Sequence, residues 1–481
     1  MNTPLLIEQS VKGRRGYYYP KTDVPSYPPL PANLQRESAP QLPEISELDV
    51  VRHYTRLATK SFGVDIGFYP LGSCTMKYNP RLHSYITSWD SLTEVHPLQD
   101  ESTIQGSLEL LYNLTKDLSS ITGMSWGTMQ PLAGAHGEYT GLKIIKAYHQ
   151  SRNDHKRTKV LIPVSAHGTN PATASVTGFS IVEVATDTRG LVDLESLKSL
   201  LDDEVAAIML TNPNTLGLFE SDIREIAHLV HGCGAQLYYD GANLNAIMGI
   251  SRPGDMGFDV IHLNVHKTLS TPHGGGGPGA GPVLVKEHLQ PFLPTPDITH
   301  NDGYYSFEWD RIQSIGKVSG FWGNFLVLVK AYTYILTMGS DGLKSASEHA
   351  VLNANYLFTL LKGAFDVPHE SRCMHEFVVS AQHYKEKYGV KALDFSKALL
   401  DRNYHPPTMY FPLNVSEALM FEPPESESVE VLEEFASTMI ELTELAKTNA
   451  DVLRLSPHST AVKRLDEVKA AKHPILTWRE L

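Results

Sequence analysis

The central part of the chain alternates short apolar runs with helix-like stretches, and this alternation restricts the possible folds. The runs are bounded by turn residues and lie at Val160–Val164, Ile181–Ala185, Ala206–Leu210, Gln236–Tyr239, Val260–Val265 and Pro282–Val285. Apolar residues at helical spacing occur between them and before them, at Leu111–Ile121, Leu142–Tyr148, Leu194–Leu201 and Ile223–Val230. Strands that alternate with helices favour a mostly parallel sheet covered by helices on both faces. We therefore predict an α/β fold.

The sequence changes character after Gly342. Long helical segments at 344–363, 391–401 and 428–447 are separated by apolar runs at Phe377–Ser380 and Tyr410–Phe411. This pattern predicts a smaller α+β domain that follows the parallel sheet. The predicted divisions are 1–95 for an N-terminal extended arm and the loop after it, 96–335 for a large domain, and 336–481 for a small C-terminal domain.

The N-terminal arm is rich in proline, which leaves little room for helix or sheet. Tyr17, Tyr18 and Tyr19 follow Arg14 and Arg15 within it. A disordered tail is one interpretation of this segment. We favour an extended arm that packs on another surface, such as a partner subunit, because three aromatic rings are costly to leave in water.

Composition excludes several functional classes. The chain of 481 residues carries a formal net charge of −13 at pH 7, which gives no electrostatic support for binding nucleic acid or an anionic membrane. Cys74, Cys233 and Cys373 lie far apart, so they predict neither a disulfide framework nor a thiolate zinc site. The first residues lack the apolar region of a secretory signal. We expect a cytoplasmic protein.

Lys267 is the first candidate for chemistry. It follows His266 at the end of the apolar run Val260–Val265, and a glycine cluster begins seven positions later, at Gly274–Gly277. Ligands of open α/β sheets bind at the carboxyl ends of strands, where partial burial can favour the neutral amine that forms an imine. A surface lysine beside a flexible loop is the alternative. A P-loop does not fit, because the glycines follow the lysine.

Asp240 strengthens the case for Lys267. It stands at the end of the preceding run, Gln236–Tyr239, so one crossover separates the two strand ends. Pyridoxal 5′-phosphate (PLP) needs both a lysine and a carboxylate that keeps its pyridine nitrogen protonated. The alternative role for Asp240 is an ordinary helix N-cap.

The segment Pro131–Glu138 leads into a predicted helix and adds a third element. Small residues at a helix N-terminus leave N–H groups free for a phosphate, and the ring of His136 could stack on a bound pyridine. A purely structural histidine is the alternative. Polar clusters at 165–172 and 211–217 also follow apolar runs and could face a ligand, although such residues are common in turns.

A zinc site is a competing interpretation of the histidines. Four of them could be grouped as ligands, but no HExxH motif and no His/Cys ligand spacing is present: His167, His262, His266 and His273. We therefore expect no metal.

Taken together, these motifs resemble the P-protein family of the glycine cleavage system, the PLP-containing glycine dehydrogenase (decarboxylating), in its two-subunit bacterial form. The resemblance runs from end to end, and its most specific motif is YPLGSCTMKYNP within Phe68–Pro80. The other matching segments are Gly13–Tyr17, Pro131–Glu138, Ala166–Ala172, Tyr239–Ala246, Asn264–Thr268, Ser314–Val318 and His405–Pro412.

The resemblance implies a PLP-dependent transferase fold of type I, similar to aspartate aminotransferase. It implies that Lys267 binds PLP covalently, that Asp240 pairs with the pyridine nitrogen, and that His136 stacks on the ring. Further cofactor-binding residues expected from it are Gly134, Ala135, Thr169, Asn170, Asn212 and His266. We propose the loop that carries Ser73, Thr75 and Lys77 as a wall on the substrate side.

The implied function is PLP-dependent decarboxylation of glycine with transfer of the aminomethyl group to the lipoyl arm of H-protein. The implied partners are subunit 1, in a heterotetramer with two copies of each chain, and lipoylated H-protein, with no nucleic acid and no membrane. Two alternatives stay open. One is another PLP enzyme of the same fold, a transaminase or a lyase, and the other is a non-catalytic scaffold subunit.

Overall fold

The computed structural model describes residues 3–25, 28–96, 98–273, 279–321 and 323–477. Contacts divide the chain into two compact units, one formed by Phe68–Pro457 and the other by Met1–Gly67 with His458–Leu481. Each unit is described by itself. The predicted glycine cluster Gly274–Gly277 lies outside the described residues.

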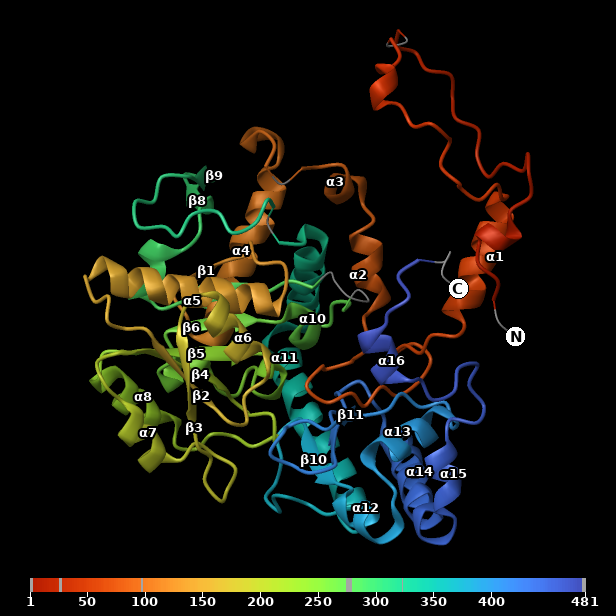
Figure 1. Cartoon of the computed structure of the whole chain (residues 1–481). Coiled ribbons are helices and arrows are strands. Elements are labelled where there is room, and N and C mark those ends of the chain that lie inside the picture. The colour runs from red at the N-terminus through yellow and green to blue at the C-terminus, as the bar shows by residue number, and fades with distance from the viewer. Residues whose placement is uncertain (1–2, 26–27, 97, 274–278, 322, 478–481) are drawn as a thin grey trace. The chain divides into compact units, whose positions relative to one another are not determined.

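The larger unit contains a seven-stranded sheet with the order β1-β7-β6-β5-β4-β2-β3 (Figure 1). The strands are β1 (Trp126–Thr128), β2 (Lys159–Pro163), β3 (Ser180–Val184), β4 (Val205–Thr211), β5 (Gln236–Gly241), β6 (Val260–Leu263) and β7 (Val283–Val285). The neighbours from β3 to β6 pair in parallel, whereas β7 pairs antiparallel with both β6 and β1. The prediction of a mostly parallel sheet is confirmed.

Alternation along the strands creates two buried faces of this sheet. Leu161, Ile208 and Leu237 belong to one apolar cluster, whereas their neighbours Val160 and Met209 belong to another. The first cluster includes residues of α4 (Gln105–Thr122), α7 (Leu194–Leu200), α8 (Ile223–Gly232) and α11 (Phe325–Leu361), and the second those of α5 (Gly134–Ser151) and α6 (Thr169–Val176). Helices therefore cover both faces, as predicted.

Helix α5 lies close to the sheet because glycines face the strands. A Cβ atom on Gly141 would stand 2.5 Å from Cε2 of Tyr238, and one on Gly137 would stand 2.9 Å from Cβ of His262. Only a residue without a side chain permits this approach. The close packing brings the N-terminus of α5 to the carboxyl end of β6.

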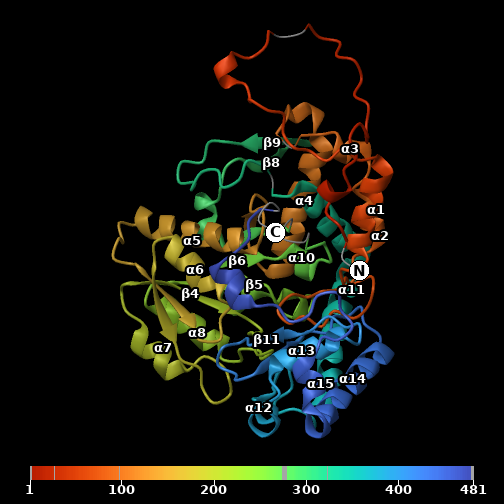
Figure 2. The ribbon, with the colours of Figure 1, turned by 45° about the vertical axis from the view of Figure 1, so that its right-hand side comes forward.

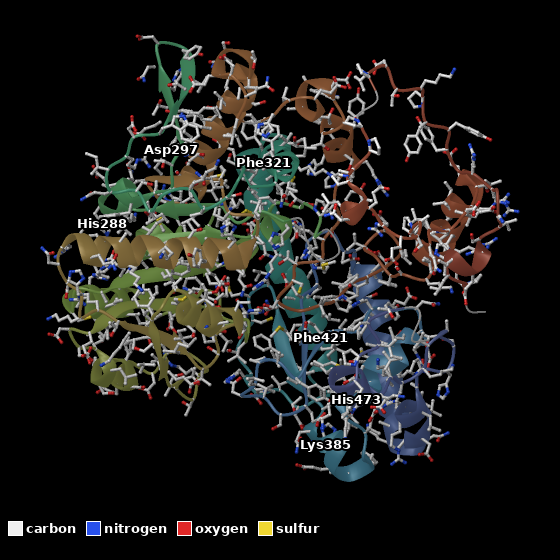
Figure 3. All side chains as sticks on the ribbon, turned by 45° about the horizontal axis from the view of Figure 1, so that its top comes forward. His288, Asp297, Phe321, Lys385, Phe421 and His473 are labelled. Carbon is white, nitrogen blue, oxygen red and sulfur yellow. The ribbon has the colours of Figure 1, made fainter. Side chains whose placement is uncertain are left out.

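A second core lies around a small antiparallel sheet of β10 (Phe377–Ser380), β12 (Ala418–Phe421) and β11 (Thr408–Met409) (Figure 2). Phe421, marked in Figure 3, stacks on Phe377 with ring centroids 5.3 Å apart. The surrounding helices are α12 (Gln382–Tyr388), α13 (Ala392–Leu400), α14 (Val429–Thr448) and α15 (Ala450–Leu455).

Two predicted elements of this region differ from the structure. The predicted run Tyr410–Phe411 is not a strand, because Tyr410 has a φ of 57° and the strand β11 ends before it. The predicted helix 344–363 corresponds to the second part of α11 (Phe325–Leu361), which consists of two helical stretches that meet at a kink at Gly339. Helix α11 thus crosses residue 336, and the predicted domain boundaries stay a prediction.

Shorter elements complete the larger unit: α2 (Arg81–Ile86), α3 (Asp90–Thr93), α9 (Pro253–Met256), α10 (Val265–Thr268), the hairpin β8 (Asp297–Asn301) with β9 (Tyr304–Glu308), and the 3-10 helices Glu101–Thr103, Leu244–Ala246 and Glu287–Phe292. Within the described ranges, none of the helices combines the length and the apolar character that crossing a bilayer requires.

The smaller unit contains α1 (Glu47–Ala58) and α16 (Glu467–Lys472). Between residues 3 and 45, the described residues form two 3-10 helices, Ile7–Gln9 and Ala32–Leu34, and otherwise no regular element. The side chains of Tyr17, Tyr18 and Tyr19 are 68%, 77% and 89% exposed. Exposed aromatic side chains of this kind are what we expect within one chain for an arm that packs on another surface.

Candidate active site

The strands β4, β5 and β6 end side by side, and a cavity of about 160 Å³ lies among the residues at the carboxyl ends of β5 and β6. Ligands of open parallel sheets bind at this edge. The lining residues are Gly134, Ala135, Glu138, His167, Thr169, Asp240, Ala242, His262, Asn264, His266 and Lys267.

Asp240 is a buried carboxylate in this lining. The N–H of Ala242 donates to its Oδ1 at 3.0 Å, and Nε2 of His262 lies 3.2 Å from the same oxygen. With its amide oriented to donate, Asn170 lies 3.2 Å from Oδ2. Burial alone would raise the pKa of Asp240, but its interaction with His262 and the charge of Lys267 outweigh burial and lower that pKa. Asp240 is therefore an anion at neutral pH.

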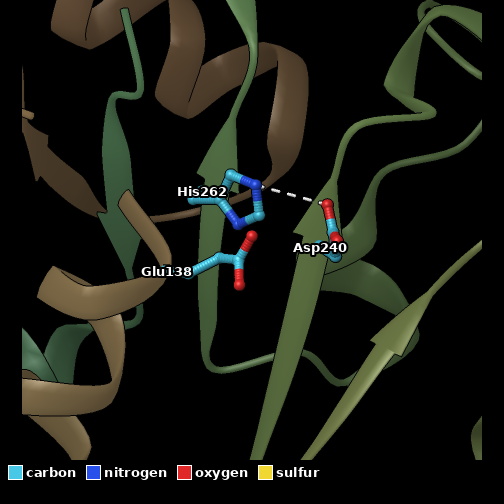
Figure 4. A group of neighbouring side chains, drawn as sticks. All are labelled: Glu138, Asp240 and His262. Carbon is cyan, nitrogen blue, oxygen red and sulfur yellow. Dashed lines mark ion pairs between the residues drawn. The ribbon is translucent and has the colours of Figure 1, made fainter. Parts of the chain in front are cut away.

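His262 faces Asp240 because the two residues are register partners in β6 and β5 (Figure 4). Burial lowers the pKa of His262, so its ring is neutral and carries one proton. An ionised Asp240 can only accept, which places this proton on Nε2. The hydroxyl of Tyr238, 2.9 Å from Nδ1, then donates to the other nitrogen. Both ring nitrogens of His262 are thus engaged.

Glu138 reaches the same place from α5, opposite Asp240 (Figure 4). The Thr169 hydroxyl donates to its Oε1 at 2.8 Å, whereas Oε2 is buried without a hydrogen-bond partner in the described part of the chain. Burial, followed by the charge of Asp240, raises the pKa of Glu138 to about 7. This carboxyl can take up or release a proton near neutral pH.

Lys267 lies on α10, one turn beyond the strand. The predicted strand to Val265 was too long, because β6 ends at Leu263 and the carbonyl of Asn264 accepts the N–H of Lys267 at 2.9 Å, which starts the turn. Nζ of Lys267 donates to the carbonyl oxygen of Ser73 at 2.8 Å. The lysine therefore lines the cavity and contacts the predicted substrate-side loop.

The loop that carries Ser73, Thr75 and Lys77 contacts the rest of the site mainly through backbone groups and buried side chains. Nζ of Lys77 donates to the carbonyl of Thr268 at 2.7 Å and to Glu425 at 2.8 Å. Burial opposes the charge of Lys77, but Glu425 raises its pKa overall. The hydroxyl of Thr75 donates to Glu422. The amino group of Lys77 is thus committed inside the protein, and a substrate-side role for the loop stays a prediction.

The structure brings together part of the predicted set. The predicted residues that line the cavity are Gly134, Ala135, Thr169, Asp240, His266 and Lys267. Asn170 contacts Asp240 without belonging to the lining. The side-chain oxygen of Asn212 instead accepts the N–H of Glu220 at 2.9 Å. Nδ1 of His136 accepts the N–H of Leu132 at 3.2 Å, and this ring is not part of the lining.

The sequence also held signals for residues that were not selected. Glu138 lies four positions after Gly134 in one helix, which places both on the same helical face. His262 lies near the end of the strand that follows Asp240. His167 belongs to the polar cluster 165–172, but the pattern does not single out this residue, because its position depends on the packing of α6 against α5.

Two protein-family models match the chain. A model described as "Glycine cleavage system P-protein" matches residues 26–299, and one described as "Glycine dehydrogenase, C-terminal domain" matches residues 346–458. A protein of Caldanaerobacter subterraneus subsp. tengcongensis, named "Probable glycine dehydrogenase (decarboxylating) subunit 2", is 58% identical over 478 residues, 98% of each chain. The chain belongs to the glycine cleavage system P-protein family.

Other relatives agree with this membership. Proteins of the same name from Desulforamulus reducens and Shouchella clausii are 56% and 55% identical, over 99% and 98% of this chain and 99% and 97% of theirs. The crystal structure of an inhibitor-bound glycine decarboxylase (P-protein) has a TM-score of 0.72 at 19% identity and covers 86% of this chain and 93% of its own. A Lactobacillus brevis glutamate decarboxylase has a TM-score of 0.65 at 13% identity, over 89% and 96%. These structures share the type I fold.

The residues present fit PLP, which the family implies. Lys267 and the ionised Asp240 line one cavity, as an imine-forming amine and a pyridinium partner must. Ala133 gives no side-chain cap to α5, so the first N–H groups of that helix are available to a phosphate. Among the described residues, Oδ1 of Asn264 and Nδ1 of His266 are also buried without a partner. These are polar groups that a bound ligand could satisfy.

Glu138 gives a prediction about stability and pH. Its folded pKa of about 7 exceeds the ordinary 4.5, so the fold gains stability from this proton at low pH and loses it as the pH rises through about 7. Relative to Glu138→Gln, the wild-type protein without cofactor should lose on the order of 2 kcal/mol between about pH 5 and about pH 8. Urea midpoints measured across that range test this. Glu370→Gln, at an exposed site, should keep the wild-type pH dependence; equal dependence in Glu138→Gln would contradict the assignment.

Proposed function

We propose that the chain is the PLP-binding, catalytic second subunit of a glycine decarboxylase in the glycine cleavage system. It decarboxylates glycine and passes the aminomethyl group to the lipoyl arm of H-protein. The observation that carries this proposal is the presence of Lys267 and Asp240 in the lining of one cavity, in a chain of this family.

The division of roles follows from the geometry of the cavity. Bound PLP supplies an electron-accepting ring that takes up the electrons left when the substrate carboxylate departs. Nζ of Lys267 would hold the cofactor. Asp240 would keep a proton on the pyridine nitrogen, since its own ionised form is maintained by His262 and Lys267.

Other residues of this chain would bind the phosphate of the cofactor or exchange a proton. The N-terminal turn of α5, with Gly134 and Ala135, would receive the phosphate. Glu138 could hold or release a proton at Oε2 near neutral pH. His136 stays the predicted stacking residue, although the imidazole rings in the lining belong to His167, His262 and His266.

The alternatives are weighed by the same residues. A transaminase or lyase would use the same lysine and aspartate, but the relatives that match the chain over almost their full length are named glycine dehydrogenases. A scaffold subunit has no need of a lysine and a buried ionised carboxylate in one cavity. The partners that we propose are subunit 1, in a heterotetramer with two copies of each chain, and lipoylated H-protein.

Covalent labelling tests the cofactor role of Lys267. Borohydride reduction of the PLP-loaded protein should attach a pyridoxyl group to the peptide that contains Lys267, as read by mass spectrometry, because Lys267 is the one lysine among the described residues that line the cavity. Lys267→Ala should fold, lose the label and lose decarboxylation. Lys286→Ala, at a lysine whose amino group donates to the carbonyl of Gly123, is the matched control and should keep the label. A label on another lysine would refute the assignment.

Asp240→Asn tests the electrostatic role of the carboxylate. The variant should still bind PLP at Lys267 but lose over about a hundredfold in decarboxylation rate, or about 3 kcal/mol of transition-state stabilisation, because a neutral amide cannot hold the pyridinium proton. Steady-state kinetics with glycine measure the loss, and the absorbance of the bound cofactor shows that binding survives. A nearly normal rate would mean that Asp240 serves only as a structural hydrogen-bond acceptor.

Deletion of residues 1–45 tests the role of the arm. The exposed rings of Tyr17, Tyr18 and Tyr19 would gain order only when a neighbouring chain buries them, and an obligate interface should exceed about 2,000 Å². The truncated chain, co-expressed with a subunit-1 homologue, should therefore assemble poorly while still binding PLP. Size-exclusion chromatography with light scattering measures assembly. Full activity of this chain alone as a homo-oligomer would contradict the need for a second subunit.

A further inference from the structure

Behind the loop of Ser73–Lys77 lies a buried cluster that the proposed mechanism does not use. His375, Glu376 and Glu422 offer ligand atoms within 4.8 Å of one another, and all three side chains are at most 1% exposed. Nε2 of His375 lies 3.7 Å from Glu376 and 3.8 Å from Glu422. Two buried carboxylates this close require a cation or a proton between them.

Glu422 has no acceptor site left for a cation or a proton. Its Oε2 accepts the N–H groups of Cys74 and Thr75, each at 2.9 Å. Its Oε1 accepts the hydroxyl of Thr75 and the amide of Asn245, the latter at 3.4 Å. A carboxylate offers about four acceptor sites, so all of them are filled by donors. Glu422 is therefore an anion, and a metal ion would have to displace one of these donors.

Glu376 keeps room for a proton. It accepts the N–H of Ser73 at Oε2, at 2.8 Å, and the amide of Asn243 at Oε1, at 3.2 Å, which leaves one site on each oxygen. Burial, followed by the charge of Glu422, raises the pKa of Glu376 well above its ordinary value. The titratable groups that face Glu376 are Glu422, Lys267, His375, Cys74 and Cys373.

The two carboxyl groups hold a backbone conformation that is otherwise unfavourable. Ser73 and Thr75 have φ angles of 62° and 47°, in the left-handed region that non-glycine residues rarely adopt. Their N–H groups donate to Glu376 and Glu422, respectively. This conformation directs the carbonyl of Ser73 toward Nζ of Lys267, 2.8 Å away.

We propose that Glu422 and Glu376, which accept the N–H groups of the loop, are positioning residues for Lys267. They fix the carbonyl of Ser73 so that it holds the amino group of the lysine whenever this amine is not bound to the cofactor. The role that we assign to this contact, to hold the amine when it is not bound to the cofactor, rests on the proposed function. The contact itself belongs to the chain without cofactor and can be tested there.

Chemical labelling of the cofactor-free chain tests the proposal. Bound PLP is removed with hydroxylamine, and acetylation of Lys267 by acetic anhydride is followed by mass spectrometry at several pH values. In Glu422→Gln, loss of the anion and of the fixed carbonyl frees the amine, so labelling near neutral pH should be about tenfold faster. In Glu376→Gln, an uncharged group replaces an uncharged group, and the rate should stay within about twofold of wild type.

Glu417→Gln is the matched control. Glu417 is also buried, accepts the N–H of Ala392 at 2.9 Å and pairs with Lys385 at 2.6 Å, so its partners lie outside the loop. This variant should label Lys267 at the wild-type rate. If Glu422→Gln does not fold, Thr75→Val removes one donor to Glu422 and should speed labelling by about two- to threefold.

Three results would overturn the proposal. The first is labelling at the wild-type rate in the folded Glu422→Gln variant, or in Thr75→Val if Glu422→Gln does not fold. The second is equal acceleration of labelling in Glu376→Gln and Glu422→Gln. The third is one equivalent of tightly bound metal in the wild-type protein that Glu422→Gln loses, as measured by plasma mass spectrometry. Failure of the proposed function is separate. It would appear as wild-type protein that does not bind PLP, and the labelling contrast would persist.

Discussion

A fully buried anion, the carboxylate of Asp240, stands at the end of the central strand β5, and the arrangement of the site depends on it. Its charge is stabilised by the neutral ring of His262 on the next strand, by the N–H of Ala242 and by the nearby amine of Lys267. Burial, together with this charge, raises the pKa of Glu138 toward neutrality. One cavity thus contains a permanent anion beside a group that exchanges protons, and an amine within reach of both. This is the combination that an electron-accepting pyridine cofactor requires.

The smaller core contributes to this site through a single loop. The loop of residues 72–77 contacts both regions, since Oγ1 of Thr408 in β11 donates to the carbonyl of Gly72 and Nζ of Lys267 in α10 donates to the carbonyl of Ser73. Glu376 and Glu422 adjoin two strands of the smaller sheet and accept the N–H groups of the loop, while Lys77 pairs with Glu425 beyond them. The loop in turn contacts Lys267 through the carbonyl oxygen of Ser73, which accepts a hydrogen bond from Nζ. The most family-specific motif of the chain is therefore the segment that connects the second core to the lysine.

The sequence predicts the parts of the site that follow from strand ends. Lys267 and Asp240 could be selected because the carboxyl ends of neighbouring parallel strands converge, and the small residues before α5 marked a helix N-terminus. The sequence places Glu138 and His262 near this edge, but their orientation into the cavity could not be predicted, because it depends on how closely α5 packs and on the register of β5 with β6. Glu376 and Glu422 lie 303 and 348 positions from the loop residues that they hold, so no local pattern connects them with the loop. The start of α10 could not be predicted either. Val265 is apolar and continues the pattern of the preceding strand, but in the structure it is the first residue of the helix, after the N-cap Asn264.

The central claim is that this cavity removes and restores the carboxylate of glycine. Exchange of isotopically labelled bicarbonate into glycine measures both directions in one assay, with the chain, a subunit-1 homologue and a lipoylated carrier protein present. The account predicts label in the carboxyl carbon of glycine alone, and only when the lipoyl carrier is added. A complex that binds PLP but gives no exchange, or that converts glycine to glyoxylate instead, would contradict it.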